Sequence, residues 1–318
     1  MEITLESTAE LLLQHANIVV TAHIHPDGDS LGSMLALSAY LTAAGKNVRL
    51  LLDDEIPKLY GFLPGINAIE QPDSRKIKAD LLVILDASDL ERIGRVKDAV
   101  DAPILNIDHH VSNTKFADYL FLDSRSAATG EIILRLLKFL KADITAAIAT
   151  SLYTAIATDC GFFRYANTSA DTMRYCAELI DCGVKPHLIS EELESKPLSS
   201  IVNLSKILET LDLFYDGKIA TITVTAETMA DNESTEGFIN YPRIIEGVEV
   251  AIMFKAADNA TCRVSMRSKR LDVSKLALSF GGGGHAKAAG CTLNGSLAEV
   301  KAKVVAAAIK ELQGMKHG

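Results

Sequence analysis

Short apolar runs alternate with longer helix-like segments along the first two thirds of the chain. Near-continuous apolar runs of this length are typical of strands in a parallel sheet that is buried on both faces. Strands that alternate with helices predict a doubly wound, mainly parallel α/β domain. The predicted strands cover residues 17–22, 48–52, 81–86 and 104–107, and the predicted helices cover 1–15, 30–44, 129–140, 144–159 and 170–182.

A second, shorter alternation follows and predicts a smaller α/β domain. A chain of 318 residues is too long for one ordinary core, which also indicates two domains. We expect a first domain at 1–196, a linker helix at 197–214, a second domain at 215–318, and a cleft between the domains. The second domain is predicted to hold strands at 219–224, 248–254 and 262–266, and helices at 273–280 and 297–312.

Acidic and imidazole side chains follow the predicted strands at the points where the strands end. In open α/β sheets the carboxyl ends of the strands form the edge where ligands bind. The sequence therefore predicts a polar site at this edge. Its candidates are His23, Asp27 and Asp29 after the first strand, Asp86 after the third, Asp108, His109 and His110 after the fourth, and Asp159 at the end of a helix.

Six of these side chains form a set suited to metal ions. Imidazole and carboxylate donors without thiolates favour Mn²⁺ or Mg²⁺ over structural zinc. Six ligands are too many for one catalytic ion with open positions, and they suit two ions that share a carboxylate. Taken alone, the loop at 23–29 is equally typical of a polar turn before a helix capped by Ser30. The six are His23, Asp27, Asp29, Asp86, His109 and Asp159.

A glycine run near the end of the chain is a candidate anion site. Glycines have no Cβ atom, so the backbone N–H groups of the run could approach a phosphate closely. An equal alternative is that the run is a flexible hinge after the preceding helix. Arg267, on the strand that leads toward the run, has a guanidinium suited to binding phosphate, and an exposed strand charge is the alternative. Arg92 is a weaker candidate of the same kind. These residues are Gly282, Gly283, Gly284 and His285 in the run, then Arg267 and Arg92.

Charge and cysteine content narrow the class of protein. A net charge of −9 without a block of Lys and Arg disfavours tracking of long nucleic acid and leaves small anionic substrates open. Five scattered cysteines without a C-x-x-C pair indicate a reducing compartment, so we expect a cytoplasmic protein. No signal peptide is apparent, and the apolar stretch at 144–158 contains Thr, Ser and Tyr, which suits a buried helix better than a membrane span.

These motifs, in this order, resemble those of the DHH phosphoesterase family, and the glycine-His run resembles that family's associated C-terminal substrate domain. The resemblance covers nearly the whole chain. It implies that His23 and Asp27 bind one metal, that Asp86 bridges, and that the remaining ligands Asp29, His109 and Asp159 bind the other. It further implies that Asp108 orients the histidines, that His110 contacts phosphate or donates a proton, and that the run from Gly282 to His285 binds substrate. His25 gains no role and is expected to be a solvated loop residue.

In length and layout the chain is similar to the NrnA-type branch of that family. This implies Mn²⁺-dependent hydrolysis, with Mg²⁺ or Co²⁺ as alternatives, of short oligoribonucleotides to nucleoside 5′-monophosphates. It also implies removal of the 3′-phosphate from adenosine 3′,5′-bisphosphate (pAp), and a homodimer. A cyclic di-AMP or pApA phosphodiesterase of the same family is an alternative, and a non-catalytic nucleotide-binding regulator is another. A RecJ-like exonuclease would be longer and more basic, and the family's pyrophosphatases lack the glycine-His run.

Overall fold

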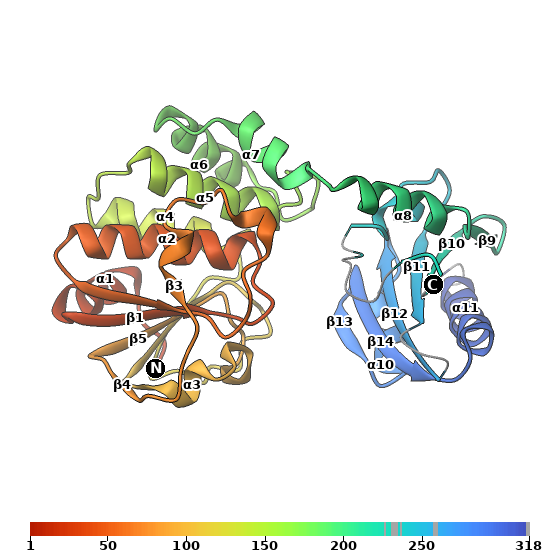
Figure 1. Cartoon of the computed structure of the whole chain (residues 1–318), viewed down its shortest axis with the longest axis horizontal. Helices are drawn as coiled ribbons and strands as arrows, with labels where there is room; N and C mark the ends of the chain where they lie inside the picture. Colours follow the sequence, from red (N-terminus) through yellow and green to blue (C-terminus); the bar gives the residue numbers. More distant parts are fainter. Residues whose placement is uncertain (226, 230–234, 236, 257–259, 316–318) are drawn as a thin grey trace. The chain divides into compact units, whose positions relative to one another are not determined.

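The computed structural model describes residues 1–225, 227–229, 235, 237–256 and 260–315. The chain divides into two compact units, Met1–Ser195 and Lys196–Gly318 (Figure 1). The first unit is built on a parallel sheet and the second on a mixed sheet, so the predicted α/β class is confirmed. Across the described residues, no helix combines the length and apolar character needed to cross a membrane.

The sheet of the first unit has six parallel strands in the order β3-β2-β1-β5-β7-β8. Every side chain of β5 is buried, as expected for a strand covered on both faces. From β1 the chain adds strands first in one direction, as β2 and β3, and then in the other, as β5, β7 and β8. The carboxyl ends of β1 and β5 therefore flank a topological switch point. The strands are β1 (Asn17–Ala22), β2 (Asn47–Leu51), β3 (Ile69–Glu70), β5 (Leu81–Leu85), β7 (Ile104–Asp108) and β8 (Tyr119–Leu122), and a separate ribbon pairs β4 (Ile77–Lys78) with β6 (Val100–Asp101).

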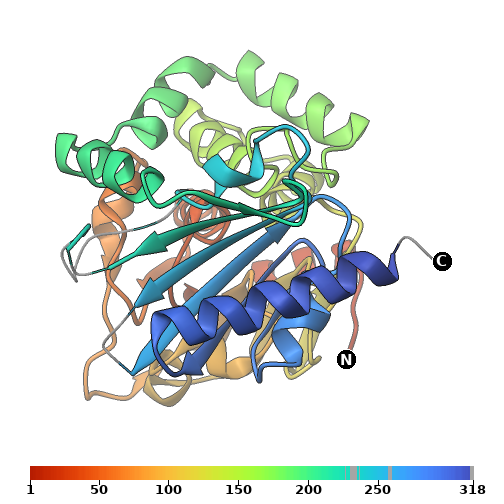
Figure 2. The same ribbon diagram turned by 90° about the vertical axis from the view of Figure 1, so that its right-hand side faces the viewer.

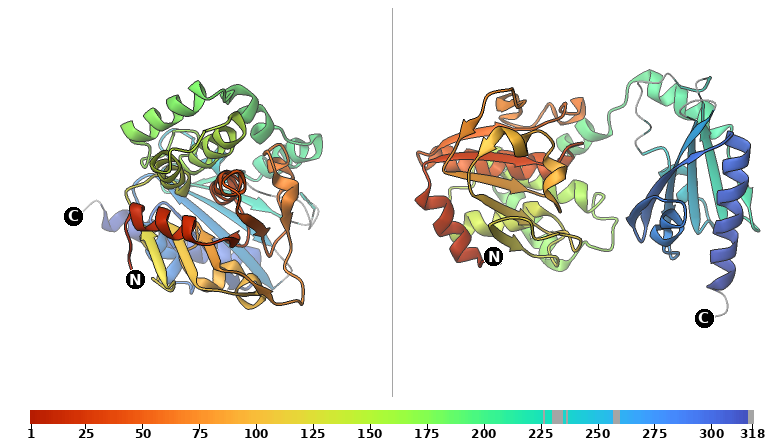
Figure 3. Two further views of the ribbon diagram at one scale, coloured as in Figure 1. Left: turned by 90° about the vertical axis from the view of Figure 1, so that its left-hand side faces the viewer. Right: turned by 90° about the horizontal axis from the view of Figure 1, so that it is seen from below.

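Helices cover both faces of this sheet (Figure 1 and Figure 3). The helices α2, α4 and α5 contribute to the large core on one face, and α3 with the turn η3 covers the other. The arrangement is the predicted doubly wound one. The helices are α1 (Leu5–Gln14), α2 (Gly28–Ala43), α3 (Val96–Ala99), α4 (Thr129–Phe139), α5 (Ala146–Asp159), α6 (Ala170–Asp181) and α7 (Pro186–Glu194), and the 3₁₀ turns are η1 (Lys58–Tyr60), η2 (Ile66–Ala68) and η3 (Leu90–Ile93).

The second unit has a sheet in the order β13-β14-β12-β11-β10-β9, in which only β10 and β11 are parallel among the described pairs. One face packs on α10 and α11, and Figure 2 shows α11 lying across it. The other face, over β10 and β11, packs on α8 and on Phe238 and Ile239, which directly precede α9. The elements are α8 (Leu198–Leu208), β9 (Asp212–Phe214), β10 (Ile219–Val224), α9 (Asn240–Arg243), β11 (Val250–Ala256), β12 (Thr261–Ser268), α10 (Val273–Leu278), β13 (Gly283–His285), β14 (Ala288–Asn294) and α11 (Leu297–Gly314).

The segment predicted as a linker helix differs from the prediction. Residues 197–214 form α8 and β9, and Leu204 and Ile207 of α8 are buried against apolar side chains of the second sheet. The segment therefore belongs to the core of the second unit, because its apolar side chains have a sheet to pack on. The cleft between the domains stays a prediction.

Candidate metal centre

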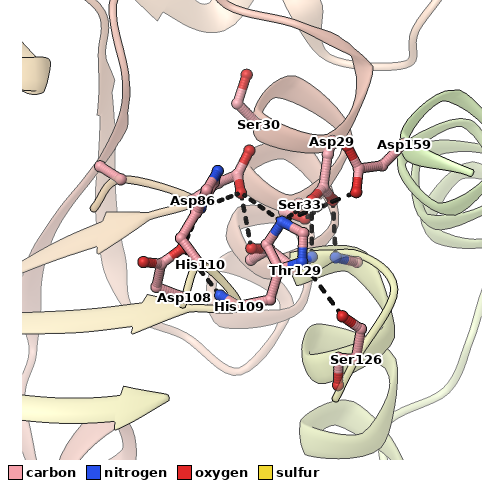
Figure 4. Close-up of polar contacts among 12 residues, drawn as sticks. Asp29, Ser30, Ser33, Asp86, Asp108, His109, His110, Ser126, Thr129 and Asp159 are labelled. Atoms are coloured by element: carbon pink, nitrogen blue, oxygen red, sulfur yellow. Dashed lines mark hydrogen bonds and ion pairs between the residues drawn. The ribbon is translucent and has the colours of Figure 1, made fainter. Parts of the chain in front are cut away.

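Six acidic and imidazole side chains meet at the carboxyl-terminal edge of the first sheet, beside the switch point between β1 and β5. Figure 4 shows several of them pointing toward one another from different elements. They form two groups within which the ligand atoms lie within 4.8 Å of one another. One group is His23, Asp27 and Asp86, and the other is Asp29, His109 and Asp159, while Asp86, His109 and His110 form a third, overlapping group.

The loop between β1 and α2 gives its two carboxylates different surroundings. Asp27 caps α2, since its Oδ1 accepts the N–H of Ser30 at 3.0 Å and the Ser30 hydroxyl accepts the N–H of Asp27 at 2.9 Å. The predicted cap, Ser30, was therefore wrong by three residues. Asp29 is buried in the first turn of the helix. A Cβ on Gly28 would lie 2.3 Å from Oγ1 of Thr158, so glycine lets α2 approach the end of α5 that carries the sixth ligand.

Backbone carbonyls fix the orientation of the two buried imidazoles. Nδ1 of His23 lies 2.7 Å from the carbonyl of Ile24, and Nδ1 of His109 lies 3.2 Å from that of Ser126. A carbonyl only accepts, so Nδ1 carries the proton and Nε2 faces the centre. Nε2 of His23 is 3.5 Å from Oδ2 of Asp86, and Nε2 of His109 is 3.5 Å from its Oδ1. Each oxygen of Asp86 thus faces a different imidazole, as a carboxylate shared by two ions would.

The start of α4 holds two of the carboxylates in place. The N–H groups of Thr129 and Gly130 donate to Asp29 at 2.7 and 2.8 Å, and the Thr129 hydroxyl donates to Asp86 at 3.0 Å. A helix amino terminus favours negative charge, so this contact stabilises the carboxylates. Thr129 and Gly130 were predicted only as the start of a helix at 129–140. The structure adds their direct contact with two ligands.

The carboxylates of the centre repel one another in this buried space. Burial first, and then the charges of Asp86 and Asp159, raise the pKa of Asp29 well above its usual range. Burial and the charge of Asp86 raise the pKa of Asp159 to about 6, although His109 opposes this. Burial disfavours protonated His23 and His109, but hydrogen bonds to neighbouring carboxylates outweigh it and raise both pKa values to about 10. Without a cation, the centre therefore draws protons onto its own imidazoles.

The donor set fits divalent cations. Four carboxylates and two Nε2 atoms converge on two groups, and none of the donors is a thiolate. Carboxylate and imidazole donors suit Mn²⁺ and Mg²⁺ better than soft metals. Two divalent ions would balance four carboxylate charges and would replace the protons on the imidazoles. The centre could thus bind metal.

Asp108 lies beneath the centre. It is fully buried, and its Oδ1 accepts hydrogen bonds from Nδ1 of His110 at 2.7 Å and from the N–H of His109 at 2.8 Å. Because Asp108 occupies Nδ1 of His110, the Nε2 of that ring is the nitrogen left to face a substrate. The orienting role of Asp108 and the substrate-facing role of His110 are compatible with this geometry and stay predictions.

Two further residues lie around the loop after β1. The side chain of His25 is 87% exposed, and its Nδ1 lies 2.8 Å from Asp54, so it points away from the centre. Arg92 lies in η3, and its carbonyl accepts the N–H of Ile24 at 2.7 Å, next to His23. The Arg92 side chain is partly exposed. Its predicted substrate role stays a prediction.

The glycine run of the second unit is not simply a loop or hinge. Residues 283–285 form β13, an exposed edge strand paired with β14. Gly284 has a φ of 137°, and a Cβ there would lie 2.6 Å from the carbonyl oxygen of Ala288. A Cβ on Gly282 would lie 2.2 Å from the carbonyl oxygen of Gly290. The glycines let this edge lie against β14, and backbone groups along the outer side of β13 form the edge of the sheet.

Cations gather on one face of the same sheet. Arg267 lies on β12, on the face opposite to the one that packs on α10 and α11. Arg263 shares this face, and Lys255 lies directly opposite it on β11. Like charges directly opposite each other destabilise a sheet, so a bound anion would relieve this pair. The sequence prediction missed Arg263 and Lys255, although the alternation of Arg263, Ser265 and Arg267 could have signalled a common face.

Comparison with known proteins links both sheets to known domains. The chain matches the DHH family N-terminal domain over residues 17–156, which include every strand of the first sheet, and the DHHA1 domain over residues 216–314. It is 33% identical to the bifunctional oligoribonuclease and PAP phosphatase NrnA of Thermus thermophilus, over 93% of this chain and 90% of that protein. It is 26% identical to the protein of the same name from Bacillus subtilis, over 87% and 89% of the two chains.

Solved structures give the same fold. An exopolyphosphatase-related protein from Bacteroides fragilis aligns with a TM-score of 0.88 and 25% identity, over 98% of this chain and 96% of that one. RecJ from Thermus thermophilus, solved in complex with Mn²⁺, aligns with a TM-score of 0.51 and 15% identity, over 96% of this chain and 54% of that one. The second likeness concerns the fold alone.

Proposed function

Because this chain belongs to the DHH family, we propose that it is a metal-dependent phosphoesterase that hydrolyses short oligoribonucleotides to nucleoside 5′-monophosphates and removes the 3′-phosphate of pAp. The observation that carries the proposal is the position of Asp86 between the two ligand groups, where one of its oxygens faces His23 of the first group and the other faces His109 of the second. The relatives named for both activities support the choice of substrates.

We assign the ions to Mn²⁺ ahead of Mg²⁺ or Co²⁺, because imidazoles beside carboxylates suit Mn²⁺ better than the harder Mg²⁺. Bound there, two such ions would lower the pKa of a shared water and neutralise charge on the phosphoryl group. In this assignment His23 and Asp27 would hold one ion, Asp29, His109 and Asp159 would hold the other, and Asp86 would be available to both.

The chain's own residues supply positioning and proton transfer. His110 donates its Nδ1–H to Asp108, which leaves Nε2 to contact the phosphate or to donate a proton to the leaving oxygen. The N–H groups of Thr129 and Gly130 keep Asp29 fixed while charge develops nearby. Arg92, whose backbone is joined to the loop bearing His23, adds positive charge for the phosphoryl oxygens.

The second unit binds the rest of the substrate in this proposal. A short oligonucleotide has few phosphates, and a small cationic face such as that of Arg267, Arg263 and Lys255 suits them. A net charge of −9 disfavours binding of long nucleic acid. Tight binding of a long strand requires an extended basic surface that neutralises many phosphates and so displaces their counterions. The further substrate-binding residues are Gly282, Gly283, Gly284 and His285.

The proposal predicts Mn²⁺-dependent release of nucleoside 5′-monophosphates from di- to pentanucleotides. Asp86→Ala should lower the rate by about 1,000-fold or more, because loss of the shared ligand costs several kcal/mol of transition-state stabilisation. Asp80→Ala is the matched control, since Asp80 precedes the other end of β5 and accepts hydrogen bonds from Asn17. Equal rates for wild type and Asp86→Ala would end the proposal.

A substrate panel with Mn²⁺ then separates the members of the family. It contains pAp, pApA, cyclic di-AMP, a 24-nucleotide RNA and pyrophosphate. We expect hydrolysis of pAp and pApA and little of the long RNA. Cleavage of cyclic di-AMP as the main activity would replace the proposed substrates, and metal binding without turnover of any compound would indicate a regulatory protein.

A further inference from the structure

We propose that Asn106 and Asn113 form a buried amide pair that positions the metal centre. The pair fixes the turn that carries Asp86 and, through Asp108, the ring of His110. This proposal rests on the proposed function, because it concerns the same metal site and reaction. Both amides lie outside the six ligands, and neither was singled out from the sequence.

The turn at Asp86 needs an external constraint. Its φ of 57° is a left-handed conformation that non-glycine residues adopt rarely and that persists where the surroundings hold it. Asn106 is fully buried on the neighbouring strand β7, and its Nδ2 donates to the carbonyls of Ile84 at 3.1 Å and Ala87 at 3.3 Å. These carbonyls lie on either side of Asp86. One amide therefore brackets the strained residue.

Asn113 connects this amide to the histidines. Its Nδ2 lies 2.8 Å from Oδ1 of Asn106 and 2.6 Å from Oδ2 of Asp108, and a primary amide has two protons to donate. Because Oδ1 of Asn106 accepts from Asn113, its Nδ2 is turned toward the carbonyls of the turn. Asp108 in turn accepts from Nδ1 of His110. A continuous chain of hydrogen bonds thus runs from the turn at Asp86 to the His110 ring.

The burial of this network is the physical reason to expect rigidity. Asn106 and Asn113 are 0% and 9% exposed, and buried amides are tolerated only when their donors and acceptors are paired. A fully paired network in a low-dielectric interior holds one geometry. The same two segments are joined a second time, since the N–H of Thr114 donates to the carbonyl of Ser88 at 2.8 Å. These hydrogen bonds therefore join the loops after β5 and β7 into one rigid unit.

Isosteric variants test the two halves of the network. Asn113→Asp places an oxygen against Oδ2 of Asp108, so kcat for pApA should fall about 10- to 100-fold while KM stays within about threefold. Asn106→Asp removes the donors to the Asp86 turn, so the Mn²⁺ affinity measured by calorimetry should fall about tenfold or more. A merely structural role would not separate kcat from KM in this way.

Asn47→Asp is the matched control, because Nδ2 of Asn47 donates to Asn17 at 3.0 Å in an amide pair at the opposite end of the same sheet. It should keep the wild-type kcat and Mn²⁺ affinity. If Asn113→Asp does not fold, Asn113→Ser and Asn113→Ala carry the test, since serine keeps a donor and should retain more of kcat than alanine.

Folded Asn106→Asp and Asn113→Asp with wild-type kcat and Mn²⁺ affinity would overturn the proposal, as would a change in KM alone, or wild-type kcat in both the serine and the alanine variant. If the wild type hydrolyses none of the substrates, the proposed function fails. Calorimetry then still decides this inference: a tenfold loss of Mn²⁺ affinity in Asn106→Asp supports it, and unchanged affinity contradicts it.

Discussion

The two sheets of this chain carry their polar chemistry in different ways. In the first unit, carboxylates and imidazoles are mostly buried at the ends of parallel strands and are held by neighbouring elements. In the second unit, cations lie on one face of a mixed sheet whose edge strand β13 is exposed. Buried charges must be fixed and balanced because their desolvation is costly, whereas exposed charges act mainly by screened attraction. We therefore expect the first unit to set the rate and the second to set substrate affinity.

After Asp86→Ala, the largest effect should come from Asp159→Asn. The Asp159 side chain is 31% exposed, so this variant removes a metal ligand with little effect on packing. We expect kcat to fall by about 100- to 1,000-fold, equivalent to about 3–4 kcal/mol, while the melting temperature is kept or rises because repulsion with Asp86 is relieved. Initial rates of pApA hydrolysis and a melting curve check this.

The control for that variant is Asp143→Asn, an exposed acidic residue just before the other end of the same helix. It should keep the wild-type rate. An Asp159→Asn enzyme with wild-type kcat would break the contrast between the two sheets.

Arg267→Ala should change affinity instead of rate. We expect KM for pApA to rise about tenfold, equivalent to about 1.4 kcal/mol, and Arg263→Ala to raise it about threefold, with kcat within about threefold in both. The effect should shrink as salt is added. Arg270→Ala is the matched control, because Arg270 is already bound by Glu249 at 2.5 and 3.0 Å. A fall in kcat with unchanged KM would show that the second unit acts on the chemical step.

The smallest effect concerns stability and pH in the metal-free protein. Folding raises the pKa of His23 and His109 from 6.5 to about 10. Between pH 6.5 and 10 the folded protein therefore keeps protons on these imidazoles that the unfolded chain has lost. This stabilisation is complete below pH 6.5 and is lost as pH rises toward 10. In EDTA, the melting temperature should therefore fall by several degrees between pH 6.5 and 9, at about 2–4 °C per kcal/mol.

Mn²⁺ should remove that fall, because metal binding requires deprotonated Nε2 atoms and stabilises the folded state. A His23→Gln, His109→Gln double variant should lack the fall in EDTA, whereas His187→Gln, which changes an exposed histidine, should keep it. A melting temperature that stays level from pH 6.5 to 9 in wild type would contradict the proposed electrostatics.

The first unit was more predictable than the second because its chemistry follows its topology. Parallel strands bring their carboxyl ends to one edge, so residues such as Asp86 and His109 could be grouped from strand order alone. The bonds of Asn106 and Asn113 could not be foreseen, because they depend on the register of β7 against β5 and on a left-handed turn. Backbone conformation at a single residue leaves no clear trace in the hydrophobic pattern.

The glycine run shows why one strand of the second unit was not predicted from the sequence. Glycine is disfavoured in strands, so residues 283–285 resembled a loop. The structure pairs them with β14, where Gly284 passes so close to Ala288 that a side chain would clash. Tertiary pairing therefore overrode local propensity. Lys255 was missed for a related reason, since only the pairing of β11 with β12 brings it opposite Arg263.

A crystal grown with Mn²⁺ and measured at the manganese absorption edge tests the central claim most directly. The account predicts two anomalous peaks in the first unit, one against His23 and Asp27, the other against His109 and Asp159, with one oxygen of Asp86 at each. A single peak, or peaks away from Asp86, would contradict it.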